Sequence, residues 1–307
     1  MAIRTGRTRL ATPFYYAFRL IIHKDRRLLR LAQIIRACVL LGPMRSTLLR
    51  YYLTHSTTAP LITDSSPLLG NLDSDQALQD LTRDGYAPLG LITAGCITQI
   101  LKYCQKHNRV RYWNPHHECD AIARIAHNEK IVDIVRRYFG AEPILWLTQV
   151  KWSAPVGPNG DRLRPSADLE PKQYDNHSFH YDANDIKSVT VFVYLTETGN
   201  DSAAHTVIQG THKSKSLKEL VRIILDDASA EKTYGARIKT IVGATGTAFI
   251  EDTLAYHKVS ACKKNRCILS IDYVLRRKIP PETRLRSRGP VRLVGNTTLR
   301  SGSPVII

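Results

Sequence analysis

Apolar residues recur with the spacing of an amphipathic helix through much of the first half of the chain. Along residues 14–53 they form a stripe beside a second stripe that carries Arg, and Gly42-Pro43 interrupts the pattern. The same periodicity returns over residues 93–107 and again over 121–138, where Gly140 is expected to end the helix. The part of the chain before Gly140 is therefore predicted to be mainly helical.

The segment that follows the first helical region has a different composition. Residues 54–76 are rich in Ser, Thr, Pro and Asp, which is typical of an irregular connection. Asp73 or Ser74 can cap a helix over 75–84, because a short polar side chain accepts hydrogen bonds from the first free backbone N–H groups. Gly85 is expected to turn the chain out of this helix.

After residue 144 the apolar residues follow a period of two, which is the spacing of β-strands. A long loop is expected at 155–177, and a helical insert near 214–230. One strand is predicted before this region, at residues 86–89. The others cover residues 144–152, 189–195, 206–208, 241–242, 247–250 and 267–275. Helices followed by short strands indicate an α+β fold, with a β-sandwich or jelly roll that carries helices on one side.

An excess of positive charge distinguishes the two ends of the chain from its middle. The 307 residues include 44 Lys and Arg against 27 Asp and Glu, a formal net charge of +17. Eleven of these cations and a single acid lie in residues 1–50. We therefore divide the chain into a basic amphipathic helical arm (residues 1–60), one folded domain (61–280) and a basic, loosely ordered tail (281–307).

The basic arm predicts a polyanionic partner, either a membrane surface or a nucleic acid. Its Arg residues are interleaved with aliphatic ones, which favours a lipid interface over a phosphate backbone. The uncharged run from Ala37 to Met44 is far shorter than the ~20 residues that span a bilayer. Six cysteines without a CxxC pair suggest a reducing compartment. We expect a cytoplasmic protein, peripheral at the inner face of the cell membrane, and leave its oligomeric state open.

The candidate chemistry lies in the strand-rich half. In a strand, residues two apart point to the same side of a sheet, so His180 and Asp182 can both enter a barrel. His257 follows another predicted strand and can supply a third ligand. Two imidazoles and one carboxylate hold Fe(II) on one face and leave three coordination positions open. A zinc hydrolase could use similar ligands, although it needs only one open position.

Arg266 lies nine residues after His257, on the next predicted strand. A guanidinium can grip a carboxylate with two parallel hydrogen bonds, so Arg266 could clamp a dicarboxylic cosubstrate that chelates the metal. In a chain with this much positive charge, Arg266 could also be an ordinary surface residue. The spacing alone leaves both interpretations open.

Several motifs between residues 78 and 276 resemble those of phytanoyl-CoA dioxygenase-like proteins, and they follow one another in the same order. The resemblance rests on an acidic-Gly-aromatic opening, a polar strand, the His-x-Asp motif, a Gly-x-His-Lys turn and a closing run of spaced polar residues. These are Asp84-Gly85-Tyr86, Leu147 to Trp152, His180 and Asp182, Gly210-Thr211-His212-Lys213, and Gly246, Asp252, His257, Asn265 and Arg266.

The resemblance implies a double-stranded β-helix (a jelly-roll or cupin-like core) that uses Fe(II), 2-oxoglutarate and O2 to hydroxylate a substrate. It implies that His180, Asp182 and His257 hold the iron and that these residues are catalytic. Arg266 would bind the far carboxylate of 2-oxoglutarate, and Gln149 would face the cosubstrate or the substrate. The chain departs from the family where Arg266 follows the His more closely and where Val259 replaces a Ser.

The substrate is predicted from charge. The loop 155–177 should overhang the site and carries Arg162, Arg164 and Lys172, which suit carboxylates or phosphates. Together with the basic arm, they favour an anionic lipid or glycolipid at a membrane. The chain is similar in class, size and charge to lipopolysaccharide Kdo hydroxylases, which act on a sugar acid of a lipid A precursor. The alternatives are a nucleic-acid- or ribosome-associated protein hydroxylase and a non-catalytic cupin-like metal-binding module.

Overall fold

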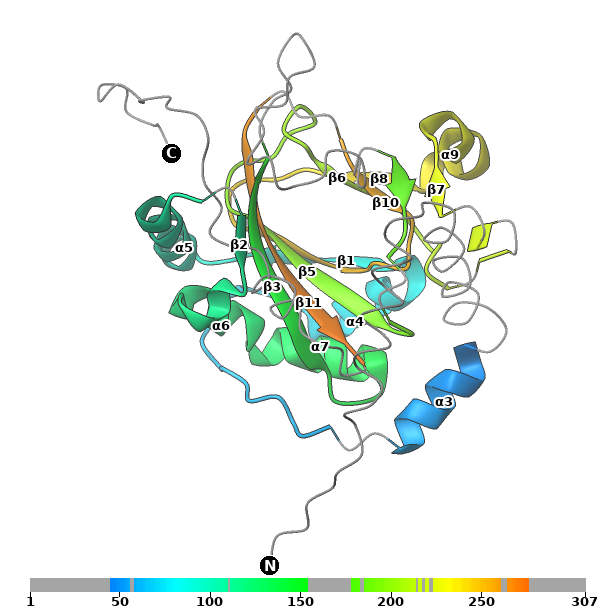
Figure 1. The fold of residues 1–307 in the computed structure, drawn as a ribbon, viewed down its shortest axis with the longest axis horizontal. Helices are drawn as coiled ribbons and strands as arrows, with labels where there is room; N and C mark the ends of the chain where they lie inside the picture. The colour runs from blue at the N-terminus through cyan, green and yellow to red at the C-terminus, as the bar shows by residue number, and fades with distance from the viewer. Residues whose placement is uncertain are drawn as a thin grey trace, which may run out of the picture.

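Two antiparallel β-sheets face each other at the centre of the molecule (Figure 1). The computed structural model describes residues 45–55, 58–109, 111–153, 178–182, 185–213, 215–216, 219–220, 223–260 and 264–275. The larger sheet has the strand order β1-β9-β5-β11-β3-β2 and the smaller one β7-β4-β10-β6-β8. The strands of the larger sheet are β1 (Tyr86–Leu91), β2 (Arg111–Trp113), β3 (Ile144–Ser153), β5 (Ser188–Tyr194), β9 (Thr247–Asp252) and β11 (Arg266–Val274).

The smaller sheet is built from short strands. They are β4 (Phe179–His180), β6 (His205–Ile208), β7 (Ile224–Leu225), β8 (Ile238–Ile241) and β10 (His257–Val259). From β3 to β6 and again from β8 to β11 the chain passes from one sheet to the other at each connection, which is the winding of a jelly roll. The structure therefore has the mixed helical and antiparallel architecture that the hydrophobic pattern predicts.

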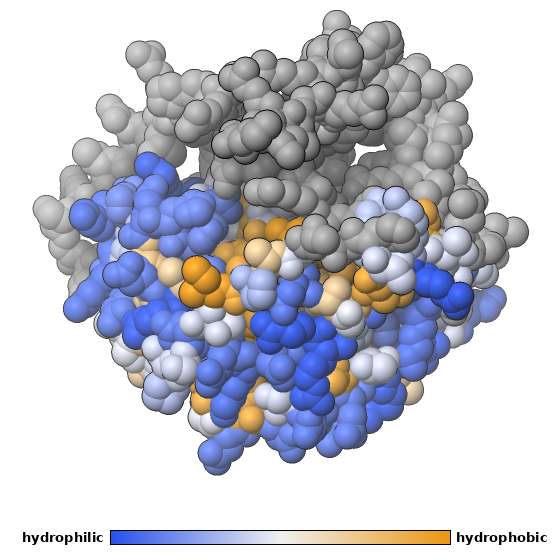
Figure 2. All heavy atoms as spheres, turned by 90° about the horizontal axis from the view of Figure 1, so that it is seen from below, coloured by the Kyte–Doolittle hydropathy of each residue, from blue (hydrophilic) through white to orange (hydrophobic). Residues whose placement is uncertain are grey.

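Helices cover the outer face of the larger sheet (Figure 1). They are α4 (Ser74–Asp84), α5 (Ala94–His107), α6 (Asp120–Ala126) and α7 (Glu129–Phe139), and a short 3₁₀ turn, η1 (Pro115–His117), precedes α6. Their apolar sides and the outward residues of β3, β5, β9 and β11 form the main hydrophobic core. Figure 2 shows the outward side of these helices, which faces away from the sheet and is mainly hydrophilic. The large sheet therefore has one face in the core and the other turned toward the smaller sheet.

Sequence signals at the helix ends are confirmed. Asp73 accepts hydrogen bonds from the backbone N–H groups of Asp75 and Gln76 at the start of α4. Gly85 ends that helix with φ 75°, a left-handed conformation that glycine adopts without strain. A side chain at this position would lie 2.4 Å from Nδ1 of His212. Gly85 is therefore required both by its backbone conformation and by the close approach of His212.

The predicted helix over 121–138 is wrong in one respect, because the structure has two helices there. α6 ends at Ala126, and Asn128 begins α7 by accepting a hydrogen bond from the backbone N–H of Ile131. The Asn side chain competes with the backbone for hydrogen bonds, which favours a cap over a helix interior. The apolar period runs across the break, so periodicity could not reveal it.

The predicted helical insert near 214–230 is also partly wrong. Residues Ile224–Leu225 form the edge strand β7, and the helix α9 (Asp227–Tyr234) begins after it, followed by the 3₁₀ turn η2 (Gly235–Arg237). Leu225 pairs with Phe179 of β4, and both side chains are buried in the same apolar cluster. Tertiary packing has therefore overridden the local preference at this edge of the smaller sheet.

Most of the basic arm lies outside the described residues, as do the tail from residue 281 and the loop 155–177. The last part of the arm forms α3 (Arg45–His55), whose Leu49 and Tyr52 pack against two apolar clusters of the folded domain. Arg45 donates a hydrogen bond to the carbonyl of His212 at 3.2 Å. Among the described helices, none is long and apolar enough to cross a membrane.

Candidate metal centre

His180 and His257 are brought together by the pairing of β4 with β10, in which they are direct Cα partners. Their ring centroids are 4.5 Å apart. Asp182 follows β4 and is held by its backbone N–H, which donates to the carbonyl of Thr253 at 2.8 Å. One ligand atom from each of the three side chains lies within 4.8 Å of the other two. The structure thus assembles the set that the sequence predicts.

Hydrogen bonds orient both imidazole rings. Nδ1 of His180 lies 3.0 Å from the carbonyl of Ser178, and Nδ1 of His257 lies 3.1 Å from the carbonyl of Ala255. A carbonyl only accepts, so Nδ1 carries the proton in both rings and the lone pair lies on Nε2. Nε2 of His257 is 3.7 Å from a carboxylate oxygen of Asp182. Nε2 of His257 is therefore an unprotonated nitrogen on the side of the carboxylate.

The three side chains differ in exposure, and this difference gives the centre an open side. His257 is buried, whereas the side chain of Asp182 is 39% exposed. Burial lowers the pKa of His257, which keeps the ring neutral and able to bind a metal. Two nitrogens and one oxygen on one face suit Fe(II), with three positions left for small molecules on the open side. The residues present therefore fit the iron ion that the sequence predicts.

Behind His257 lies a buried polar pair that the sequence analysis missed. Oε2 of Glu251 in β9 is 2.5 Å from Nε2 of His205 in β6, and both side chains are almost completely buried. Burial raises the pKa of Glu251 to about 8. Burial, followed by the charge of Arg266, lowers the pKa of His205 to about 3. In the sequence, the one sign of this buried pair is that Glu251 is an acid on the same strand face as the apolar Phe249.

Arg266 begins β11 and is 2% exposed, so it is not an ordinary surface residue. Its guanidinium donates to the carbonyl of Ala203 and lies 3.5 Å from Oγ of Ser153, its Cα partner on β3. After burial, the charge of Arg266 is the next cause that lowers the pKa of His205, and the His205 ring stacks on that of His257 with 5.5 Å between centroids. The structure therefore brings Arg266 to the interior that also contains the metal triad.

Gln149 lies in β3, on the face of the larger sheet that is turned toward the smaller sheet. Its neighbour Val150 is buried in the main core on the helical side, so Gln149 points to the opposite face, toward the smaller sheet. Lys151 lies on the same face and is the Cα partner of Arg111 in β2. Burial lowers the pKa of Arg111, whose guanidinium lies over the ring of Trp113. These two cations on the inner face were not singled out from the sequence.

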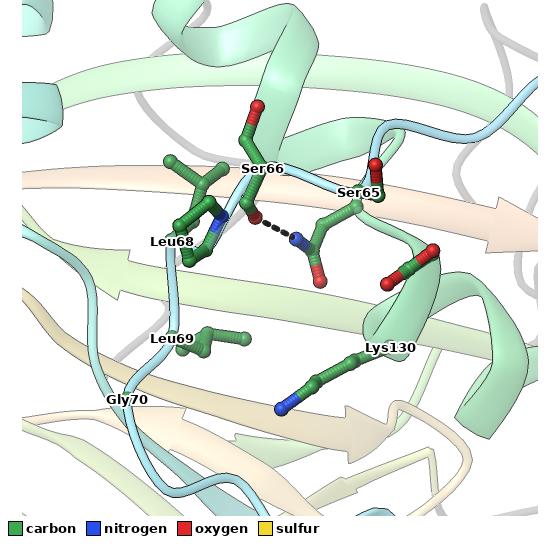
Figure 3. Close-up of a pocket in the computed structure, with 9 residues that line it drawn as sticks. Ser65, Ser66, Leu68, Leu69, Gly70 and Lys130 are labelled. Atoms are coloured by element: carbon green, nitrogen blue, oxygen red, sulfur yellow. Dashed lines mark hydrogen bonds between the residues drawn. The ribbon is translucent and has the colours of Figure 1, made fainter.

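The three cations predicted to bind substrate, Arg162, Arg164 and Lys172, lie outside the described residues. A cavity of about 160 Å³ is present on the helical side, where residues 65–70 meet the start of α7 (Figure 3). Its walls include Lys130 and Asn128, and the side-chain amide of Asn128 donates to the carbonyl of Ser66. None of the metal triad lines this cavity, so it is separate from the candidate site.

Comparison with known proteins gives a limited match in sequence. No family model matches the chain, and the resemblance to phytanoyl-CoA dioxygenase-like proteins therefore stays a prediction. The chain is 28% identical over 105 residues to a probable alpha-ketoglutarate-dependent hypophosphite dioxygenase from Stutzerimonas stutzeri. The match covers 34% of this chain and 32% of that protein, so it spans about a third of the curated relative.

The likeness to solved structures is broader. EctD from S. alaskensis with bound Fe superposes with a TM-score of 0.50 and 14% identity, over 74% of this chain and 88% of that one. A structure of the same protein with 2-oxoglutarate and 5-hydroxyectoine has a TM-score of 0.48 and 14% identity, over 71% and 84% of the two chains. The first likeness shows the fold. The protein of the first likeness binds iron, one of the two expected cofactors, and the His-Asp-His triad of this chain can hold such an ion.

Proposed function

We propose that the protein is an Fe(II)- and 2-oxoglutarate-dependent dioxygenase that hydroxylates an anionic substrate. The observation that carries the proposal is the convergence of His180, Asp182 and His257, whose ligand atoms lie within 4.8 Å of one another. Iron bound there with 2-oxoglutarate supplies the oxidising chemistry, and the protein supplies orientation and shielding. A zinc hydrolase would use a similar triad, but the buried Arg266 favours a dicarboxylic cosubstrate.

Each of the other inner-face residues has a role in this proposal. Arg266 binds the far carboxylate of 2-oxoglutarate, and its bonds to Ala203 and Ser153 fix the direction of the guanidinium before the cosubstrate arrives. Gln149 donates or accepts a hydrogen bond at the same ligand or at the substrate. The buried side of the centre is closed by Glu251 and His205, so that ligands approach from the side of the half-exposed Asp182.

We also propose that the substrate is an anionic lipid or glycolipid, such as the Kdo sugar of a lipid A precursor. Arg111 and Lys151 support the anionic class, because these two cations lie directly opposite each other on the face of the larger sheet that is turned toward the smaller sheet. The cations of the basic arm support a membrane surface, where each Lys or Arg contributes about 1 kcal/mol of salt-sensitive attraction. The protein would then act as a peripheral protein at the inner face of the cell membrane.

The oxygenase proposal is tested by succinate release. Purified protein reconstituted with Fe(II), 2-oxoglutarate and O2 is incubated with separate lipid, sugar-acid, protein and RNA fractions, and with hypophosphite, on which the curated relative is named to act. We expect succinate and a product 16 mass units heavier in an anionic lipid or sugar-acid fraction. His180→Ala should abolish both. Equal, background succinate from wild type and His180→Ala in every fraction would favour a non-catalytic metal-binding module.

The membrane proposal needs a separate test. Co-sedimentation with vesicles of anionic lipid is compared with vesicles of neutral lipid, over a range of salt concentrations. We expect binding to the anionic vesicles alone, and its loss when Arg26, Arg27 and Arg30 are all changed to Glu. Binding to RNA or DNA without binding to vesicles would instead support the ribosome- or nucleic-acid-associated hydroxylase.

A further inference from the structure

Lys215 places its ammonium group against two tyrosine rings at the smaller sheet. Nζ lies 4.5 Å from the centroid of the Tyr181 ring and 4.2 Å from the centroid of the Tyr256 ring. The same Nζ donates a hydrogen bond to the carbonyl of Thr211 at 2.9 Å. A cation within about 6 Å of a ring centroid is attracted by the face of the ring, and more strongly when water is excluded. Lys215 therefore interacts with both rings at once.

The two tyrosines come from the segments that carry the metal ligands. Tyr181 directly follows His180, and Tyr256 directly precedes His257. Because neighbouring side chains of an extended chain point to opposite faces, both rings point away from the ligands, and both are buried in one apolar cluster. The rings meet edge to face, with 5.4 Å between centroids and an interplanar angle of 76°. Lys215 thus lies behind the two ligands, on the other side of their strands.

The segment that carries Lys215 holds the same two rings by their hydroxyl groups. The hydroxyl of Tyr181 donates to the carbonyl of Leu220 at 3.0 Å, and the hydroxyl of Tyr256 donates to the carbonyl of Glu219 at 3.3 Å. Both rings are therefore fixed at their polar ends by backbone groups and at their faces by one ammonium. The segment has no contact of this kind that would favour one ring over the other.

The strands that carry the two histidines have few contacts with each other. Among the described residues, the register of β4 with β10 has one residue pair, His180 with His257. Lys258 of β10 adds a contact across these strands, with its ammonium 4.7 Å from the centroid of the Phe179 ring. Lys215 contacts a ring from each segment instead. It is therefore placed to keep the two ligands at one spacing.

We propose that Lys215 is a positioning residue of the metal centre. Its ammonium clamps the rings of Tyr181 and Tyr256 together, which fixes the spacing of His180 and His257 on the opposite face. The inference rests on the metal-binding part of the proposed function and not on the identity of the substrate. Groups that orient metal-binding histidines typically change metal affinity 10–100-fold. Because the clamp acts through the strands and touches neither ligand, the lower end of this range is expected.

The test is a titration of Co(II) into metal-free protein, followed by the visible absorption of the bound ion. Lys215→Met keeps an unbranched side chain of similar length but removes the charge, and Lys215→Arg keeps a cation. Lys213→Met is the matched control, because Lys213 lies two residues away and is exposed. The titration is run at pH 6, because burial lowers the pKa of Lys215 to about 7 and the amine must carry its proton. Thermal unfolding of each metal-free variant reports stability separately.

We expect Co(II) to bind Lys215→Met about tenfold more weakly than wild type, with a shifted absorption spectrum. Lys215→Arg should recover most of the affinity. Lys213→Met should stay within about twofold of wild type, because an exposed charge contributes little. Unchanged affinity and spectrum in Lys215→Met, or an equal loss in Lys213→Met, would overturn the inference alone. Wild-type protein that binds no Co(II) would overturn the metal centre and the inference together.

A double-mutant cycle distinguishes the clamp from a general loss of packing. Tyr181→Leu removes one ring from the ammonium and keeps an apolar side chain in the cluster. Either Tyr181→Leu or Lys215→Met alone already breaks the clamp, so the second change has less left to remove. We therefore expect the double variant to bind Co(II) more tightly than the product of the two single effects predicts. Single effects that multiply would show that the two residues act independently, which overturns the inference.

Discussion

His180 and His257 are direct partners across two strands that are only two and three residues long. Pairings this short contribute few backbone hydrogen bonds, so the smaller sheet has little local stability of its own. A metal ion bound by both rings would join β4 to β10 at this point. The metal centre is therefore expected to stabilise the sheet that forms it.

Metal removal should lower the stability of the folded protein. A ligand that binds only the folded state at 100 times its Kd stabilises that state by about 2.7 kcal/mol. We expect the unfolding temperature of wild type to rise when Co(II) or Fe(II) is added without oxygen and to fall with a chelator. Asp182→Ala should unfold at one temperature under both conditions. A chelator effect of equal size in wild type and Asp182→Ala would exclude the triad as the site.

Arg266 should act on 2-oxoglutarate and not on the metal. Arg266→Lys keeps the positive charge but cannot form two parallel hydrogen bonds with a carboxylate. We expect the KM for 2-oxoglutarate to rise at least about tenfold, which corresponds to roughly 1.4 kcal/mol of binding, while Co(II) affinity stays unchanged. The KM comes from succinate release at varied 2-oxoglutarate. An unchanged KM would assign Arg266 a purely structural role through its bond to Ala203.

Gly85→Ala should destabilise the fold without touching the metal centre. The substitution places a methyl group 2.4 Å from the His212 ring at a residue with φ 75°, and we expect a loss of about 2 kcal/mol. Gly95→Ala is the control, because Gly95 lies in α5 with no atom within 4 Å of an added Cβ. Ala should stabilise that helix by up to about 1 kcal/mol. Equal unfolding temperatures of the two variants would refute the packing argument.

The stability of the protein should fall in mild acid, partly because of His116. Burial, followed by the charge of His117, lowers the pKa of His116 to about 4, and its Nδ1 lies 2.8 Å from Oγ1 of Thr148. Between about pH 4 and 6.5 the unfolded chain therefore binds a proton that the folded one does not. Stability is lost as the pH falls through this range, by at most about 1.4 kcal/mol per pH unit from this residue.

Urea unfolding at pH 6.5 and pH 4.5 checks this sign. His116→Gln removes the titrating group while it keeps a side chain able to bond to Thr148. We expect the variant to lose less unfolding free energy than wild type between the two pH values. The other buried histidines contribute equally to both proteins, so they cancel in the difference. A variant that loses as much as wild type would place the acid sensitivity elsewhere.

Much of the secondary structure could be predicted because its signals are local. The N-cap at Asp73 and the left-handed turn at Gly85 act within a few residues, and both are where the sequence places them. The break between α6 and α7 and the strand β7 were missed. The strand β7 depends on a distant partner, because Leu225 pairs with Phe179. The break between α6 and α7 lies at the Asn128 cap, and the apolar period runs across it.

The sequence by itself determined the type of ligands, because few residue types bind iron and the His-x-Asp spacing predicts two side chains on one side of a strand, although Asp182 lies just beyond the end of β4. Only the tertiary structure decided what surrounds them. Glu251 and His205 are 46 residues apart in the chain, and no spacing rule connects them. Their contact depends on how β6 of one sheet faces β9 of the other. Such long-range juxtaposition is set by the packing of the whole barrel, which no local pattern of polar and apolar residues encodes.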